Sequence, residues 1–219
     1  GSFAVRAGPT MAMADEFFID IAGRGGHAAK PELARDPIVA GAALVQALHT
    51  IVSRQVDANE AAVLSITRFN GGSATNVIPE QVELAGTVRA FSEATHGAIS
   101  KAIERKCAQF GAAFGVSISY RQGESVYPPV HNDPDEAAFC GRVLDALVGR
   151  DRVTHDHPPV MGSEDFAFLA KARPGAFVFI GSGDIAPLHH PEYDFDDAVS
   201  PWGVTYWVQL VEAALPRPA

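Results

Sequence analysis

Along residues 15–125 the spacing of hydrophobic residues switches between the repeat of a strand and the repeat of a helix, in an order that few folds can satisfy. Four segments alternate apolar and polar side chains, which is typical of strands, and two repeat apolar residues three and four positions apart, which is typical of helices. The strand-like segments are 17–21, 62–69, 81–91 and 116–120, and the helical segments are 37–54 and 93–115. Their order is strand, helix, strand, strand, helix, strand. It predicts a ferredoxin-like domain, in which two helices cover one face of a four-stranded antiparallel sheet.

The remaining segments, 1–14 and 126–219, follow a different pattern. Two helices are expected to start near Asp133 and Ser200, each of which is followed by a proline, and the short apolar run 177–180 lies between them. A run in which every residue is apolar predicts a strand buried on both faces of an α/β sheet. One such strand with helices around it cannot make a doubly covered sheet. We therefore expect these segments to form part of a larger α/β domain.

The charge of the chain excludes one class of partner and indicates another. The formal net charge is -9, whereas a nucleic-acid partner requires a basic surface. Residues 15–125 carry 10 basic and 12 acidic side chains, and residues 126–219 carry 6 basic and 14 acidic ones. We therefore expect no nucleic-acid partner, and we expect a cation to bind in the acidic C-terminal part.

The cysteines and the hydrophobic runs indicate a compartment. Cys107 and Cys140 lie in segments with helical apolar spacing, so we interpret them as buried thiols and not as a disulfide. No run of 18 or more apolar residues is present, so we expect no membrane partner. These features favour a cytoplasmic location. The chain begins with Gly1 and Ser2 and has no initiator methionine, so the sequence leaves open whether its start is native or a cut.

The loop 23–27, Gly-Arg-Gly-Gly-His, is the first candidate for chemistry. Its glycines allow the backbone to bend sharply and to bring the imidazole of His27 close to a ligand. The loop lies between the strand-like segment 17–21 and a helix in which Asp36 is the expected N-cap and Pro37 the first residue. The alternative is that His27 is a loop histidine that makes local hydrogen bonds only.

Three further places contain residues that can bind a metal or a substrate. His189 and His190 follow the apolar run, where α/β sheets place their sites, and acidic residues come next; the alternative is a solvated acidic loop. The His155-Asp-His157 spacing suits a metal, but exposed positions without a ligand role are the favoured interpretation. Ser163 precedes two acidic residues, which is sufficient as the capped start of a helix. The sequence has no P-loop, no dinucleotide-binding glycine motif and no serine or cysteine nucleophile motif.

Seven blocks occur in one order and carry a resemblance to a known family. They are GRGGHAA (23–29), DPI (36–38), FNGG (69–72), NVIP (76–79), GTVRAF (86–91), GSEDF (162–166) and LHHPEYDF (188–195). With these blocks the chain resembles the C-terminal part of a metal-dependent amidohydrolase of the aminoacylase and carboxypeptidase superfamily, in the branch of hippurate hydrolase and the indole-acetyl-amino-acid hydrolases.

The resemblance implies a domain organisation. Residues 15–125 would be a ferredoxin-like lid and dimerisation domain, inserted into an α/β hydrolase domain of the zinc-peptidase type. Residues 1–14 and 126–219 would be the C-terminal part of that catalytic domain, which lacks its N-terminal part here. The implied fold class is therefore α/β with an α+β lid.

The resemblance also implies substrate-contacting residues. His27 and Asn76 match the family residues that contact the substrate and the developing oxyanion. Arg89 and Glu164 are candidate substrate-binding residues, and Arg89 would bind a substrate carboxylate. A solvated arginine on the polar face of its strand is the open alternative for Arg89. One departure, Glu32 where relatives often have a histidine, affects the loop and not the chemistry.

By the same resemblance, His189 is a metal ligand. The family's other ligands are a Cys-x-His pair, a Glu-Glu pair and a further histidine, and none of those segments is present here. Asp194, Asp196 and Asp197 are candidates for orienting the imidazole of His189. The complete protein would bind two divalent ions, and Mn, Zn, Co and Ni all accept such ligands.

The implied activity is hydrolysis of the amide bond of N-acyl or N-aroyl amino acids, such as hippurate-like compounds. The expected partners are this small-molecule substrate and a second copy of the chain, in a homodimer made through the lid. The chain by itself is expected to be inactive and to bind no metal properly. The alternative from another class is a non-enzymatic ferredoxin-like dimerisation module with scaffold segments.

Overall fold

A computed structural model describes residues 1–215, which form two compact units. The central unit contains Ala12–Pro129 and Met161–Glu164. The terminal unit contains Gly1–Met11, Val130–Val160 and the described residues from Asp165 onward. These boundaries are at 12 and 129, where the sequence analysis expected 15 and 125, and Met161–Glu164 lies in the central unit and not with the terminal segments.

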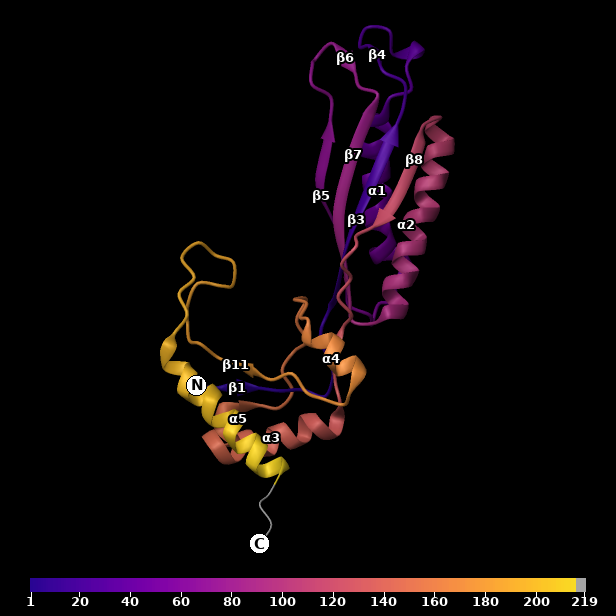
Figure 1. Ribbon diagram of the computed structural model, residues 1–219. Helices are drawn as coiled ribbons and strands as arrows, with labels where there is room; N and C mark the ends of the chain where they lie inside the picture. Colours follow the sequence, from indigo (N-terminus) through magenta and orange to yellow (C-terminus); the bar gives the residue numbers. More distant parts are fainter. Residues whose placement is uncertain (216–219) are drawn as a thin grey trace. The chain divides into compact units, whose positions relative to one another are not determined.

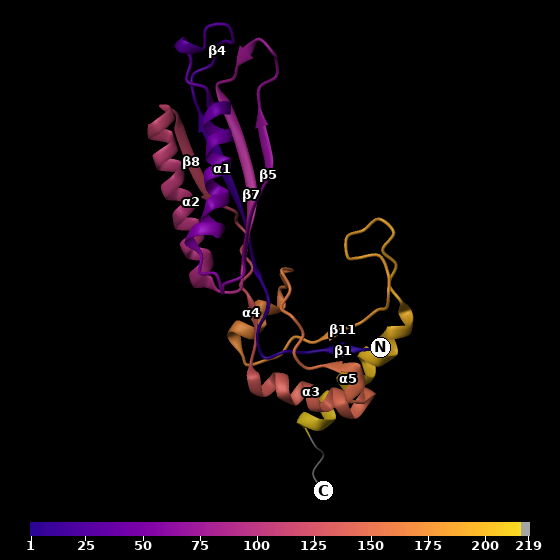
Figure 2. The same ribbon diagram turned by 180° about the vertical axis from the view of Figure 1, so that it is seen from behind.

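The central unit is built on a four-stranded antiparallel sheet (Figure 1). Its strands are β3 (Met13–Ala22), β5 (Ala62–Gly71), β7 (Gln81–Ala90) and β8 (Ser117–Gln122), in the order β5-β7-β3-β8. Helices α1 (Pro37–Gln55) and α2 (Glu93–Phe114) lie on the same face of this sheet in both views (Figure 2). β3 and β7 are therefore the inner strands, and β5 and β8 each present one unpaired edge.

The period-two pattern of the inner strands explains why the helices cover one face only. In β3 the side chains of Phe17, Ile19 and Ile21 are fully buried, and they form the core of the central unit with residues of both helices. Leu44 of α1 and Ile103 of α2 are fully buried in the same core. Burying a side chain of this size stabilises the fold by about 1.5–3 kcal/mol, so this one face supplies most of the unit's stability.

Local chemistry sets the helix ends where the sequence predicts them. The Asp36 carboxylate accepts hydrogen bonds from the amides of Ile38 (2.8 Å) and Val39 (3.3 Å), which caps α1. α2 ends at Gly115, whose φ of 64° is left-handed and suits glycine. Both helices therefore have the bounds expected from the sequence, to within one residue.

One polar cluster lies inside this otherwise apolar core. Asp15 is 2% exposed and His96 is 6% exposed, and the ring Nε2 of His96 lies 3.0 Å from the carboxylate of Asp15. The side-chain amide of Gln122 donates a second hydrogen bond to the same oxygen, over 2.9 Å. Burial removes the carboxylate from bulk water, so its Oδ2 depends on these two partners. The cluster ties β3, α2 and β8 together, and the sequence analysis did not single it out.

The terminal unit has a small sheet with helices beside it. Strand β1 (Phe3–Ala4) pairs with β10 (Val153–Thr154) in parallel and with β11 (Phe179–Ile180) in antiparallel orientation. A separate pair joins β2 (Gly8–Met11) to β9 (Val130–Asn132). The helices are α3 (Pro134–Val148), α4 (Phe166–Ala172) and α5 (Ser200–Ala214). The general α/β class predicted from the sequence is confirmed.

Two local predictions for the segment after residue 126 were wrong. The run 177–180 was expected to be a strand buried on both faces, but only Phe179–Ile180 is a strand, and both residues are half-buried. The reason is that the backbone of Phe177 bonds to a side chain: its N–H donates to Asn132 over 2.7 Å and its carbonyl accepts from Asn132 over 2.9 Å. Ser163 was expected to cap a helix, but α4 starts at Phe166.

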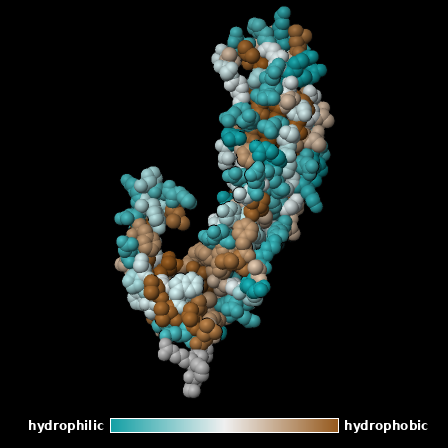
Figure 3. Space-filling view, in the orientation of Figure 1, coloured by the Kyte–Doolittle hydropathy of each residue, from teal (hydrophilic) through white to brown (hydrophobic). Residues whose placement is uncertain are grey.

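Apolar side chains remain exposed on the terminal unit. On α5 the exposed fraction is 64% for both Val204 and Trp207, and Figure 3 shows hydrophobic residues at the surface of this unit. A cavity of about 230 Å³ opens beside them, lined by apolar residues that include Phe166 and Leu210. A contiguous apolar surface of this kind is unusual for a self-contained domain, because water contact with it is unfavourable.

Helix α1 is long and apolar enough that length and composition alone would allow it to span a membrane. Its residues Leu44, Leu48 and Ile51 are instead buried against the sheet, as in a core helix. The two cysteines, Cys107 and Cys140, are buried and free, as predicted, and burial raises the pKa of the Cys107 thiol to about 12. Burial therefore keeps the Cys107 thiol protonated near neutral pH.

Candidate functional site

His27 and Asn76 lie on one small ribbon at the end of the central sheet (Figure 1). Strand β4 (Gly26–His27) pairs with β6 (Val77–Ile78), so that His27 faces Val77 across the ribbon. The amide of Ala28 donates to the carbonyl of Asn76 over 3.0 Å. Both candidate side chains are exposed. The structure thus brings together two residues that are 49 positions apart in the sequence.

The hydrogen bonding of the His27 ring determines where its proton is. The amide of Ala29 donates to Nδ1 of His27 over 3.1 Å. Because an amide nitrogen donates, Nδ1 must be the accepting nitrogen, and the proton of the neutral ring is therefore on Nε2. The ring thus presents an N–H donor away from its own turn. This is the tautomer that donation to an oxyanion requires.

The backbone of the glycine-rich loop is held by tight contacts. The amide of Gly23 donates to the carbonyl of Glu80 over 2.8 Å, and Arg24 and Arg35 exchange two backbone hydrogen bonds of 2.9 Å. A side chain at Gly23 would overlap the carbonyl oxygen of Arg35. The glycine is therefore required by the close approach of the two segments, in agreement with the sequence analysis.

Arg89 lies on β7, half-buried, with its side chain on the open face of the sheet. Its Nη1 donates to the hydroxyl of Ser163 over 3.1 Å. Ser163 therefore accepts a hydrogen bond from Arg89 and does not cap a helix. Both line a cavity of about 450 Å³ in the central unit. Glu164 is half-buried beside Ser163 in the chain. The structure thus brings Arg89 and the 161–164 segment together.

The two groups of candidates are at opposite ends of the same strand. The ribbon with His27 and Asn76 joins β7 at Gln81, and Arg89 is eight residues further along that strand. At about 3.4 Å per residue, the separation along β7 is roughly 27 Å. A single small substrate cannot contact both groups within one central unit.

His189 lies in the terminal unit, in a turn, and is exposed. Its φ of 69° makes it the one non-glycine residue with positive φ among residues 1–215. Such a conformation is rare outside glycine and is often found at functional sites. The ring of neighbouring His190 accepts a hydrogen bond from the amide of Glu192 over 3.1 Å, so it is engaged within its own turn. No sequence signal indicated this strain.

The acidic residues that follow do not gather around His189. Asp196 caps the short helix that starts at Asp197, accepting from the amide of Ala198 over 3.0 Å. Asp194 is exposed. Within the part of the chain that the structure describes, no group of three histidine, cysteine or acidic side chains is close enough to hold a metal ion.

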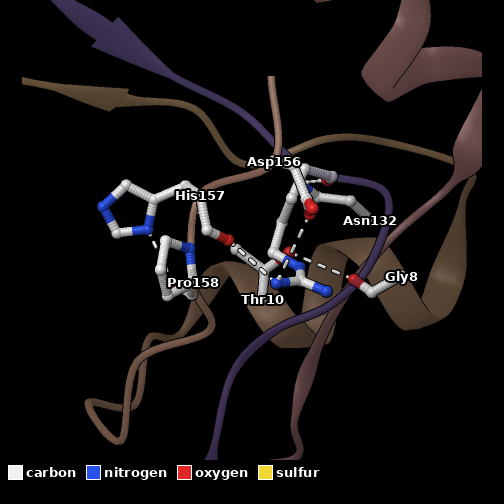
Figure 4. Close-up of polar contacts among 7 residues, drawn as sticks. Gly8, Thr10, Asn132, Asp156, His157 and Pro158 are labelled. Atoms are coloured by element: carbon white, nitrogen blue, oxygen red, sulfur yellow. Dashed lines mark hydrogen bonds and ion pairs between the residues drawn. The ribbon is translucent and has the colours of Figure 1, made fainter. Parts of the chain in front are cut away.

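The HxH motif is engaged in local contacts of the terminal unit. His155 pairs with Asp145 through a 2.7 Å contact from its Nε2. Figure 4 shows the ring of His157 directed at Pro158, whose carbonyl accepts from Nδ1 over 2.6 Å. The carbonyl of His157 itself accepts from Arg6 over 2.8 Å. Both histidines therefore have local structural partners, and the two rings do not share a ligand position.

The chain is similar to solved structures of one class of protein. The Bacillus subtilis YXEP protein, described as a dinuclear metal binding peptidase from the M20 family, has a TM-score of 0.78 with this chain at 29% identity. The match covers 97% of this chain and 53% of the YXEP chain. The chain belongs to the peptidase family M20/M25/M40, whose sequence pattern matches residues 7–213. The family resemblance predicted from the seven blocks is therefore confirmed.

Two curated relatives give the chain's position within the family. It is 35% identical to the hippurate hydrolase of Campylobacter jejuni over 209 residues, which covers 95% of this chain and 54% of the relative. It is 36% identical to the N-acetyl-L-cysteine deacetylase of Bacillus subtilis over 197 residues, covering 90% of this chain and 46% of the relative. The chain thus spans about half the length of the relatives that it matches.

We predict that Gly23→Ala disrupts the ribbon that carries His27 and Asn76. The new methyl group would overlap the Arg35 carbonyl, so the free energy of unfolding should fall by at least about 1 kcal/mol. The matched control is Gly97→Ala in α2, where nothing lies within 4 Å of the new atom and a gain of up to about 1 kcal/mol is expected. Urea unfolding and the amide spectra of the ribbon measure both. Equal stability of the two variants would contradict the close approach.

Proposed function

We propose that this chain is part of a metal-dependent amidohydrolase that hydrolyses the amide bond of N-acyl or N-aroyl amino acids. Membership of the peptidase family supports the reaction class, and the names of the hippurate hydrolase and deacetylase relatives support the substrate class. The observation that carries the proposal is the exposed ribbon, where His27 presents its Nε2–H beside Asn76. We also place the protein in the cytoplasm, which its two free, buried thiols support.

The proposed roles follow from the donors that each side chain offers. His27 through Nε2–H and Asn76 through its amide group would donate to the oxyanion that forms when the amide carbonyl is attacked. Donors of this kind act in the transition state, where the charge develops, and each is typically worth about 10²–10³ in rate. Arg89 would bind the carboxylate of the amino acid, and Glu164 would lie close to the same ligand.

The proposal includes two divalent metal ions, and His189 is the ligand that this chain would contribute. The relative from Bacillus subtilis, described as dinuclear, supports this composition. The described residues do not by themselves form a group of three ligands, so they do not fit a complete metal centre. We therefore derive no step through the metal from this chain.

We propose that the central unit is a ferredoxin-like lid that also makes a homodimer. Strands β5 and β8 are the outer strands of its sheet, and each has an edge able to pair with a second copy. The 27 Å separation along β7 gives a further reason, because Arg89 and the His27 ribbon can act on one substrate only if they belong to different copies. In a two-fold dimer each copy would provide its His27 ribbon to the site that contains Arg89 of the other copy, so two equivalent sites would form.

The alternative is a dimerisation module without catalytic activity. The exposed His27 would then have only its local hydrogen bond to Ala29. Both readings include a lid that dimerises. Activity measurements therefore discriminate between them and association alone does not.

We predict that His27→Ala lowers kcat by about 10²-fold or more. The measurement uses an active form of the enzyme, which also contains the part of the relatives' length that this chain does not span. Stability should change by less than about 0.5 kcal/mol, because the side chain is exposed. His49→Ala, which removes an exposed histidine of α1, is the matched control and should leave kcat unchanged. An unaltered kcat in the His27 variant would leave the ring with its local structural role only.

We predict that, in the same active form, two variants of low activity complement each other when mixed. Random association of His27→Ala with Arg89→Ala subunits gives half mixed dimers, and each mixed dimer has one site with neither substitution. About a quarter of the wild-type activity should therefore return. Native mass spectrometry confirms that mixed dimers are present. Mixed dimers without activity would show that both residues act within one subunit.

We predict that the 219-residue chain alone is inactive and binds no divalent ion tightly. One imidazole cannot hold a metal ion firmly, because binding requires several ligands that converge at about 2.0–2.2 Å. Added Mn or Zn should therefore leave the melting temperature unchanged in calorimetry. A large metal-dependent rise, or turnover of an N-benzoyl amino acid, would refute this prediction.

A further inference from the structure

The ribbon that carries His27 also exposes an apolar side chain. Val77 of β6 is 51% exposed, whereas the next residue, Ile78, is 8% exposed. Successive residues of a strand point to opposite faces, so Ile78 lies on the buried face of the ribbon and Val77 on its outer face. A single exposed valine is ordinary on a protein surface. The position of Val77 beside a candidate catalytic group is what distinguishes it.

The hydrogen bonds of the ribbon define how closely His27 and Val77 lie. These two residues are paired in register, and in the next pair along the ribbon the amide of Ala28 donates to the carbonyl of Asn76 over 3.0 Å. Hydrogen-bonded and non-hydrogen-bonded pairs alternate, so His27 and Val77 form a non-hydrogen-bonded pair. The side chains of such a pair lie on one face, with Cβ atoms roughly 4.5–5.5 Å apart. The methyl groups of Val77 therefore lie beside the base of the His27 side chain.

The His27 ring would bring one particular part of the substrate to this valine. Its Nδ1 accepts from the amide of Ala29, so its Nε2–H is the group that can donate to the substrate carbonyl. The acyl group is attached to the carbon of that carbonyl and is therefore held close to the ribbon. In the proposed dimer the amino-acid portion extends toward Arg89 of the other copy. The acyl group is thus the apolar part of the substrate that remains to contact Val77.

We infer that Val77 is a specificity-determining residue, which packs against the acyl or aroyl group while His27 donates to the carbonyl oxygen of the same group. This inference rests on the proposed function and assigns recognition of the acyl side to one residue. An apolar contact of this kind is present in both the bound substrate and the transition state, so it lowers KM and leaves kcat unchanged. His27 differs, because its hydrogen bond to the developing oxyanion acts on kcat.

The test uses Val77→Thr in the active form of the enzyme. Threonine is β-branched like valine and suits a strand equally well, but a hydroxyl replaces one methyl group. N-benzoylglycine and N-acetylglycine differ only in the acyl group. The KM for N-benzoylglycine should rise about fourfold, the value of one buried methylene group, with kcat unchanged. The KM for N-acetylglycine should change by less than about twofold, because acetyl offers less apolar surface.

Two further variants assign the effect to an apolar contact at this position. Val77→Ile keeps an apolar, β-branched side chain and should retain the wild-type ratio of the two KM values or increase the preference for the benzoyl substrate. Val63→Thr makes the matched exchange on β5, opposite Arg89 and far along β7 from the ribbon, and should leave the ratio unchanged. Equal melting temperatures of Val77→Thr and the wild type would show that the ribbon is intact.

A third substrate separates contact with the acyl group from contact with the amino-acid side chain. N-acetyl-L-leucine differs from N-acetylglycine only in that side chain, so its KM should change no more than that of N-acetylglycine. A larger change with the leucine compound, equal changes with all three substrates, or a fall in kcat with all three would overturn the inference alone. A wild-type enzyme that hydrolyses none of the three would count against the proposed function together with the inference.

Discussion

The pairing of β3 with β7 is the constraint on which the rest of the central unit depends. Ten residue pairs hold these strands in register, and the period of two then assigns every side chain to one of two faces. Phe17 and Leu84 consequently lie in the core under the helices. Glu16 and Arg89 lie in the cavity of the other face. A shift by one residue would bury the charges and expose the core, so stability and the candidate binding site are specified by the same register.

The length of β7 has a consequence for assembly. The strand keeps the His27–Asn76 ribbon at one end and Arg89 at the other, and a rigid, doubly flanked strand cannot bend to bring them together. If both groups contact one substrate, a second copy must provide one of them. The exposed edges of β5 and β8 offer the means, because unpaired backbone groups favour strand addition. Dimerisation and catalysis would then be coupled by geometry.

The terminal unit differs because its sheet is too small to cover its helices. β1 is flanked by two strands of two residues each, and apolar side chains of α5, including Trp207, remain in contact with water. The strained turn at His189 is part of this unit. A unit with exposed apolar surface and one candidate ligand is consistent with a chain that spans about half the length of its relatives. The terminal unit nevertheless has a hydrophobic core of its own, in which Leu144 is fully buried.

Local patterns in the sequence determined the elements of the central unit, the caps at Asp36 and Gly115, and the tight loop of His27. The periods, the caps and the glycines of the loop are readable from residues close together in the chain, whereas the pairing that holds the loop, with Glu80 and Val77, is not. The buried Asp15–His96 pair joins residues 81 positions apart, and the only local signal was that Asp15 precedes the predicted strand 17–21 in phase with its apolar residues. The hydrogen bond from Arg89 to Ser163 joins residues 74 positions apart, and the hydrogen bond from Phe177 to Asn132 keeps Phe177 out of the expected strand. These depended on tertiary structure, because only the folded chain determines which distant polar group satisfies a given donor or acceptor.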